Sequence, residues 1–233
     1  MIFYSVNING IHMKEQYGMV LEEMHYAPPP SPKKTLISVP GRDGDVDLSD
    51  IHGDIAYHNR TVTISLGTLK SRKEWPILYS EILNNFNGRP VEVIFDDDPN
   101  YFYKGRAEVT SYERFQRLGT LKIIVDADPY KYELNDGTSD WIWDVFSLED
   151  GIIREYKDVV VNGSAAITII GRRKRVIPII ECSSPMILTY KNKTINLDMG
   201  TTKVYELQLG EGEHVLEFSG NGTVTVSYRG GSL

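Results

Sequence analysis

Hydrophobic and polar residues alternate with a period of two through most of this chain. Val62, Ile64 and Leu66, for example, are interleaved with hydroxyl residues, and the same alternation recurs at 121–125 and 224–228. Turn-forming pairs separate such segments, because Asn-Gly favours tight hairpin turns. They stand at Asn9-Gly10, Asn162-Gly163 and Asn221-Gly222. The pattern predicts a mainly β protein.

One segment has a helical period instead. Apolar residues recur at intervals of three and four from Trp75 to Phe86. Ser71 and Glu74 have the spacing of a capping box. Pro76 opposes a start that early, because proline has no N–H to donate inside a helix. With Asn87-Gly88 as a left-handed stop, the sequence predicts one α-helix over about residues 75–86. Residues 141–149 are a weaker candidate for a second, short helix.

A polar, turn-rich stretch at about residues 128–139 predicts a boundary between two domains. The N-terminal domain, about residues 1–133, holds the helix and long loops. We expect it to be a β-sandwich or barrel-like structure with a protruding arm at about 26–60. The C-terminal domain, about residues 140–233, has short strands at close spacing, which is typical of a β-sandwich.

The stretch at about 26–60 is predicted to be an arm between subunits. Its prolines favour a stiff extended conformation, its glycines provide hinges, and its aliphatic residues need cover that a solvated loop does not give. The alternative is a flap folded on its own subunit. The candidate interface residues are Pro28, Pro30, Leu36, Ile37, Val39, Gly41, Arg42 and Gly44.

Composition narrows the classes of partner. The 233 residues include 25 Lys and Arg against 32 Asp and Glu, so the formal net charge is −7. That balance argues against sequence-specific nucleic-acid binding and against an anionic membrane surface. The single cysteine, Cys182, excludes an intrachain disulfide framework. No apolar run has the length of a membrane span, and the N-terminus lacks the charged region of a signal peptide. We therefore expect a soluble protein.

Two acidic clusters are candidates for chemistry. The alternating acids Asp43, Asp45 and Asp47 suggest calcium, but Leu48 stands where an EF-hand needs glycine, so a solvated acidic loop is the better interpretation. The run Asp96, Asp97 and Asp98 is better explained as a turn between two strands than as an acid–base pair. The histidines lack zinc-ligand spacing, and there is no nucleophile elbow or phosphate-binding glycine loop. The prediction is a protein that is not an enzyme and needs no cofactor.

Two further clusters have alternative interpretations. The basic run 172–175 could contact phosphate, but between two predicted strands it is better explained as an exposed hairpin tip. Trp141 and Trp143 could stack on sugars, although their place after the boundary favours packing between domains. Cys182 is expected to be a small buried apolar residue.

A set of short motifs resembles the distal tail protein family of tailed phages. The first group is Pro40-Gly41-Arg42-Asp43-Gly44, Asp47-Leu48-Ser49, Gly53, Tyr57 and Asn59-Arg60. The matches that follow, in the family's order, are the helix at Trp75, Asp97-Asp98-Pro99, Tyr101 to Arg106, Asp126 to Lys131, and the C-terminal Ser227 to Leu233. The resemblance rests on this order over residues 1–131 and is looser after residue 140.

The resemblance implies a virion structural protein of a phage or prophage. Its site would be the baseplate at the virion tail tip, reached after synthesis in the cytoplasm of the bacterial host. It implies a homo-hexamer that joins the major tail tube protein to the tail-tip hub, or tail-associated lysin protein, and that can carry a receptor-binding protein. It also implies a ring-forming N-terminal β domain with one helix and a C-terminal galectin-like β-sandwich. The second half is too short for the inserted carbohydrate-binding module of enlarged relatives.

A ring through which duplex DNA passes should not bind that DNA, which carries about one charge per 1.7 Å. We therefore expect an acidic, water-lined channel, with Asp43, Asp45 and Asp47 or Asp96, Asp97 and Asp98 as its lining. Two other functions stay open: a carbohydrate-binding, lectin-like protein that uses the C-terminal sandwich, and a glycan-cleaving enzyme. A lectin needs exposed aromatic residues. Its candidates are Trp141, Trp143, Tyr156, Tyr190, Tyr205 and Tyr228.

Overall fold

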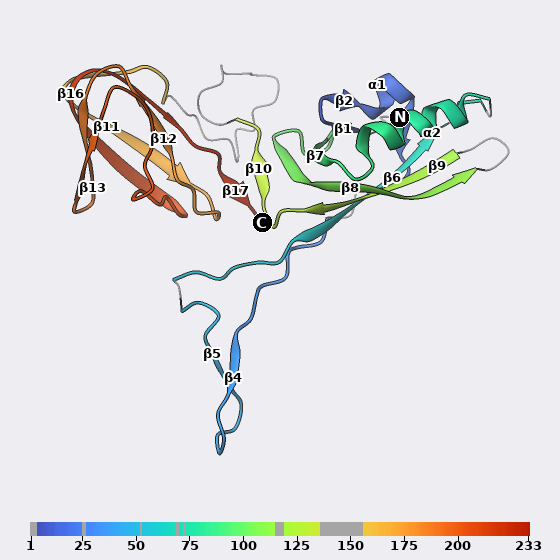
Figure 1. Ribbon diagram of the computed structural model, residues 1–233, viewed down its shortest axis with the longest axis horizontal. Coiled ribbons are helices and arrows are strands. Elements are labelled where there is room, and N and C mark those ends of the chain that lie inside the picture. Colours follow the sequence, from blue (N-terminus) through green and yellow to red (C-terminus); the bar gives the residue numbers. More distant parts are fainter. Residues whose placement is uncertain are drawn as a thin grey trace. The chain divides into compact units, whose positions relative to one another are not determined.

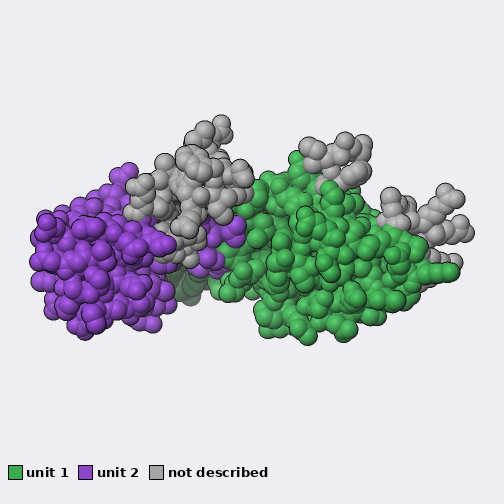
Figure 2. Space-filling view, turned by 90° about the horizontal axis from the view of Figure 1, so that it is seen from above, with its two compact units in different colours: residues 1–131, 233 green, residues 132–232 purple. Residues whose placement is uncertain are grey.

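The computed structural model describes residues 4–24, 27–51, 53–68, 70–71, 73–114, 119–135 and 156–233. Its secondary structure is mainly antiparallel β, which confirms the predicted fold class. The chain divides into two compact units, Met1–Lys131 with Leu233, and Tyr132–Ser232 (Figure 2). The predicted helical candidate at 141–149 lies outside the described residues.

The first unit is built on one curved antiparallel sheet with the strand order β2-β1-β7-β8-β9-β6-β3 (Figure 1). The strands are β1 (Val6–Ile8), β2 (Ile11–His12), β3 (Met19–Leu21), β6 (Arg60–Thr68), β7 (Pro90–Phe95), β8 (Tyr101–Arg114) and β9 (Gly119–Ala127). The sheet nearly closes, because the Leu21 N–H donates to the Tyr4 carbonyl (3.0 Å) and the Ser5 hydroxyl donates to the Met19 carbonyl (2.9 Å). The unit is therefore barrel-like.

The core of this unit is formed by the apolar residues that occupy every second position of the strands. In β6 the residues Val62, Ile64 and Leu66 are buried, and Leu121, Ile123 and Val125 of β9 are buried on the same side. Backbone pairing brings Ile64 opposite Ile123, so the two apolar faces meet as one layer.

The helix α2 (Trp75–Phe86) occupies the predicted range and covers this core. Ser71 and Glu74 are hydrogen-bonded side chain to side chain at 2.6 Å, and Pro76 sits in the first turn, where no N–H is needed. The residues that face the core are Trp75, Leu78, Ile82 and Phe86, all buried. A methyl group on Gly119 would overlap the Trp75 indole, so the helix lies in close contact with β9 at this glycine.

A second helix, α1 (Met13–Tyr17), was not predicted. It is only five residues long, it buries Met13 and Tyr17, and it ends at Gly18 in the left-handed conformation (φ 66°). So short a helix has no full amphipathic repeat to reveal it.

The second unit is a β-sandwich organised by one long strand pair. β11 (Val159–Gly171) pairs with β16 (Gly212–Ser227) along its whole length. On the other edge of β16, residues 217–219 pair with β13 (Met186–Tyr190), and residues 224–227 pair with β12 (Ile179–Cys182). β14 (Lys193–Leu197) pairs with β13, and β15 (Gly200–Lys203) pairs with β12. Cys182 is buried as expected, and burial raises the pKa of its thiol.

The basic run 172–175 is not the exposed hairpin tip that the sequence suggests. Arg172 Nε donates to Glu133 Oε1 at 2.9 Å, and Lys174 Nζ donates to the Tyr132 hydroxyl at 3.0 Å. Tyr132 and Glu133 belong to β10 (Lys131–Glu133), which pairs with the C-terminal β17 (Gly231–Ser232). These cations therefore fasten the start of the second unit to its own sandwich.

Candidate assembly interface on the projecting arm

Residues 27–59, between β3 and β6, form an arm that extends away from the sheet of its own unit (Figure 1). Its outer part is a ribbon of two antiparallel strands, β4 (Leu36–Ser38) and β5 (Asp45–Asp47), which pair with each other. A two-stranded ribbon has marginal stability by itself in water. The pairing of β4 with β5 therefore gives the outer arm little stability by itself.

Arg60 anchors the root of the arm. Its side chain is buried, and its guanidinium donates to the carbonyls of Ala27 (3.1 Å), Pro28 (3.0 Å) and Pro129 (3.4 Å). It also lies over the Tyr103 ring, 5.4 Å from the centroid. Burial lowers the pKa of Arg60 from its ordinary value, although a guanidinium still stays charged at neutral pH. One side chain thus ties the first residues of the arm to the end of β9.

The stem beyond the root is held by backbone pairing. The Lys33 N–H donates to the Ala56 carbonyl (2.8 Å), and the His58 N–H donates to the Ser31 carbonyl (2.9 Å). The Tyr57 ring packs edge-on against the Tyr130 ring, with 6.0 Å between the ring centroids. Pro30 is buried and Pro28 is half-buried. These two candidate interface residues therefore belong to the root and stem, not to the free part of the arm.

The outer ribbon has two chemically different faces. Ile37 lies opposite Val46, whereas Leu36 lies opposite Asp47 and Ser38 lies opposite Asp45. Because side chains alternate across a strand, Ile37 and Val46 share one face, and the two aspartates share the other with Leu36 and Ser38. The exposed fractions of Leu36, Ile37 and Val39 are 51%, 46% and 40%. The described residues of the chain therefore cover these aliphatic side chains only in part.

The tip of the ribbon is a turn stabilised by glycine. The Arg42 N–H donates to the Val39 carbonyl at 3.1 Å, and Gly41 and Gly44 have φ of 82° and 74°. These values lie in the left-handed region that side chains disfavour. The turn leaves the Arg42 side chain exposed at the end of the arm.

The two acidic clusters are in different situations. Asp96 accepts from the Ser5 N–H (2.7 Å) and lies 3.0 Å from His12 Nε2, and Asp98 forms a 2.7 Å ion pair with Lys131. This cluster stabilises the turn between β7 and β8, as its turn interpretation predicts.

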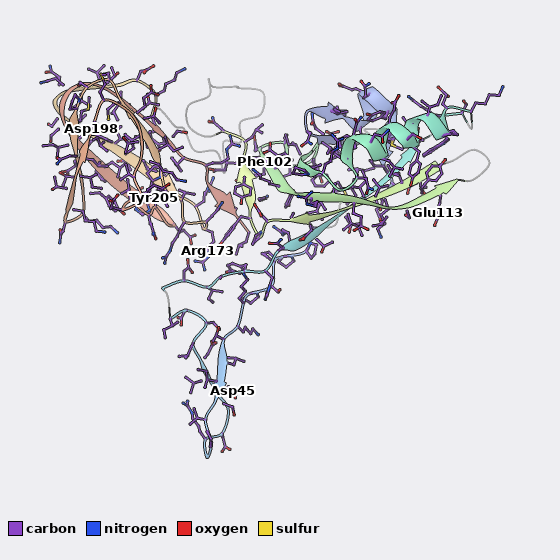
Figure 3. All side chains as sticks on the ribbon, viewed as in Figure 1. Asp45, Phe102, Glu113, Arg173, Asp198 and Tyr205 are labelled. Atoms are coloured by element: carbon purple, nitrogen blue, oxygen red, sulfur yellow. The ribbon has the colours of Figure 1, made fainter. Side chains whose placement is uncertain are left out.

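On the arm, the side chains of Asp43 and Asp45 are exposed and form no hydrogen bond or ion pair with the described residues (Figure 3 labels Asp45). Asp47 accepts hydrogen bonds from the side chain and N–H of Ser49, which lower the pKa of its carboxyl group. Within the described ranges no three potential ligands come close enough together to hold a metal ion.

The second unit offers few features of a sugar site. Tyr156, Tyr190 and Tyr228 are buried, and Tyr205 is exposed. A hollow of about 290 Å³ lies near Tyr190, whose hydroxyl is 2.7 Å from His214 Nδ1, while His214 Nε2 is 2.9 Å from the Gly210 carbonyl. Both ring nitrogens of this buried histidine are thus occupied. Trp141 and Trp143 lie outside the described residues.

No helix in the described ranges is long and apolar enough to span a bilayer.

Comparison with known proteins gives a structural match only. No family model matches the sequence, and no curated protein matches it. Among solved structures, the fold is similar to that of the SPP1 Dit protein, described as a paradigm of the hub adsorption apparatus in phages that infect Gram-positive bacteria. The sequence identity is 11%, the alignment covers 98% of this chain and 99% of that chain, and the TM-score is 0.58. At this identity the likeness shows a shared fold over the whole chain.

Proposed function

We propose that this chain is a distal tail protein of a phage or prophage, with a structural role at the virion tail tip. The observation that carries the proposal is the likeness to SPP1 Dit, which extends over both units and nearly the full length of both chains. Shared fold alone does not prescribe function. The family motifs in residues 40–60 add independent support, because the arm and its anchor Arg60 are built from that stretch.

In this proposal six copies close into a ring that connects the tail tube to the tail-tip hub and the receptor-binding apparatus. Identical subunits joined head to tail make either a closed ring or an open filament, and a tail tip requires closure. The arm suits a head-to-tail contact, because it places exposed aliphatic residues away from the rest of its unit. Its firm root at Arg60 limits the directions in which it can point.

The lining of the proposed channel is assigned to the arm acids. Asp43 and Asp45 are exposed and unpaired within the described residues, whereas Asp96 and Asp98 are held by contacts within their own unit. Hydrated carboxylates repel the phosphates of duplex DNA, and they do not displace the counterions of the DNA as lysine and arginine would. An acidic lining therefore lets DNA slide through without being trapped.

Native mass spectrometry across a range of protein concentrations tests this proposal. The wild-type chain is expected to populate hexamers. A variant that replaces residues 36–47 with a Gly-Ser turn should lose them while retaining its unfolding transition. Deletion of 28–34 is less informative, because it also removes the Pro28 carbonyl that Arg60 binds. Hexamers that survive loss of the ribbon would contradict the role of the arm, and the flap alternative would then be favoured.

The sugar-binding alternative has a separate test. Glycan-array binding of the full chain should be at background, because Tyr156, Tyr190 and Tyr228 are buried and Tyr205 is the one exposed tyrosine among the four candidates. Specific glycan binding that Tyr205→Ala abolishes would favour the lectin-like function instead.

A further inference from the structure

The sequence contains four Asn-Gly pairs, which begin at Asn9, Asn87, Asn162 and Asn221. In such a pair the main-chain nitrogen of the glycine can attack the side-chain carbonyl carbon of the asparagine, because glycine has no side chain that would shield its nitrogen. The reaction releases ammonia and needs no enzyme. In a folded chain its rate depends on how the structure holds each asparagine.

Three of the four asparagine side chains are held by hydrogen bonds. The amide oxygens of Asn9, Asn87 and Asn221 each accept from a main-chain N–H, at 2.8, 2.9 and 3.0 Å. Their carbonyl carbons cannot turn toward the following nitrogen without breaking these bonds. Asn162 is different, because its side chain is exposed and forms no hydrogen bond with the described residues.

Asn162 also lies where the long pairing of β11 with β16 bends. It stands opposite Asn221, and Gly163 stands opposite Gly220. Gly163, Gly220 and Gly222 have φ of 78°, 148° and 144°, so the ladder is irregular on both strands. On its other edge, β16 pairs with β13 before the bend and with β12 after it. Glycine weakens a strand, and a ladder without a third strand opens locally at a lower free energy than the rest.

One contact opposes the reaction at Asn162. The attacking atom would be the Gly163 nitrogen, whose hydrogen is donated to Asn221 Oδ1 at 3.0 Å. This acceptor belongs to the side chain of an exposed residue, which can rotate away. The Gly88 N–H, by contrast, is donated to the main-chain carbonyl of Ala107 at 2.8 Å. The Asn221 side chain is therefore placed to control the release of the Gly163 nitrogen.

We infer that Asn162 is the deamidation site of the folded chain and that Asn221 sets the rate of its conversion. The Gly163 nitrogen bonds to Asn162 Cγ, the Cγ–Nδ2 bond breaks, and the Gly163 amide proton leaves with the Nδ2 group as ammonia. Water then opens the cyclic imide at either carbonyl. The products are aspartate and isoaspartate, in which the main chain runs through the side-chain carbon.

Peptide mapping by mass spectrometry of the full chain, incubated at mildly alkaline pH, tests the site. The same incubation in denaturant gives the reference rate of each Asn-Gly pair in the unfolded chain. Relative to that reference, conversion at Asn162 should be several times faster than at Asn9, Asn87 or Asn221. Equal protection of all four pairs, or faster conversion at any of the other three, would overturn the inference.

Asn221→Ala tests the control by Asn221. The change frees the Gly163 N–H and should accelerate conversion at Asn162 several-fold. Conversion at Asn9 and Asn87 should not change, because both residues lie in the first unit. An unchanged rate at Asn162 in this variant would refute the role of Asn221.

The modification should weaken the second unit. Isoaspartate adds an atom to the main chain within the pairing of β11 with β16, which organises the sandwich. Aged wild-type chain should therefore unfold at a lower temperature than an Asn162→Gln chain aged in parallel, because glutamine would have to form a larger ring. Asn162→Asp adds the charge without the extra atom and should unfold close to the fresh wild-type chain. Identical unfolding of the aged wild-type and Asn162→Gln chains, at measured conversion of Asn162, would contradict this effect.

Discussion

At the scale of single residues, the arm depends on one buried cation. Arg60 has three carbonyl acceptors and an aromatic ring beneath it, so its charge is compensated by dipoles alone in the contacts described. No charge pattern in the sequence reveals this anchor, because its acceptors are backbone carbonyls and its other contact is an aromatic ring. Arg60 therefore has a physical role in this structure, which is to hold the root of the arm.

Arg60→Ala should loosen the arm. The change leaves partly buried carbonyls without donors and is expected to cost about 1–3 kcal/mol in the free energy of unfolding. Hydrogen exchange should accelerate in residues 27–59 before the rest of the first unit. Arg60→Lys should restore only part of the protection from exchange. Lysine keeps a cation at this position, but its ammonium lacks the fork of donors that the guanidinium offers to several carbonyls. Unchanged exchange in the Arg60→Ala arm would show that the anchor is not needed.

Glu22 provides a prediction about pH. Glu22 is exposed, but neighbouring atoms remove part of its hydration, and this effect, followed by repulsion from Glu23 and Glu113, raises the pKa of its carboxyl group from the ordinary value of 4.5. A carboxyl group whose pKa is higher in the folded state destabilises the fold as pH rises through that pKa. Glu22→Gln should therefore raise the melting temperature at pH 7, and the gain should vanish well below pH 4.5. A gain of equal size at both pH values would contradict this origin.

At the scale of elements, periodicity predicted regular structure well and irregular contacts poorly. The helix over 75–86 follows from its apolar spacing and from Pro76, and the structure places it there. The contacts of Arg172 with Glu133 and of Lys174 with Tyr132 could not be predicted from periodicity, because the partners are about 40 residues apart in the sequence. The hollow near His214 was also missed, since it arises where two strands separate.

The helix offers a matched pair of substitutions. Ile82 is fully buried against the sheet, whereas its neighbour Leu83 is only half-buried. Ile82→Ala should cost about 2–5 kcal/mol in the free energy of unfolding, because it leaves a cavity in the core. Leu83→Ala should cost less than half as much. Denaturant melts of the two variants check this, and equal losses would mean that the helix is rotated relative to the sheet.

At the scale of the whole molecule, the sequence alone predicted a mainly β chain and an exposed arm. It could not distinguish an arm between subunits from a flap, because that depends on what covers Ile37 and its neighbours. The structure narrows the question by showing that those residues are only partly covered within their own unit. It also separates the two acidic clusters, which look alike in sequence but differ in their contacts.

The central claim is that copies of this chain form a closed ring around a channel that does not bind DNA. Electron microscopy of the assembled protein tests it most directly, because one reconstruction gives both symmetry and lining. The account predicts a sixfold ring with arms bridging adjacent subunits and with Asp43, Asp45 or Asp47 facing the channel. A symmetry incompatible with six, an open filament, or a channel lined mainly by lysine and arginine would contradict it.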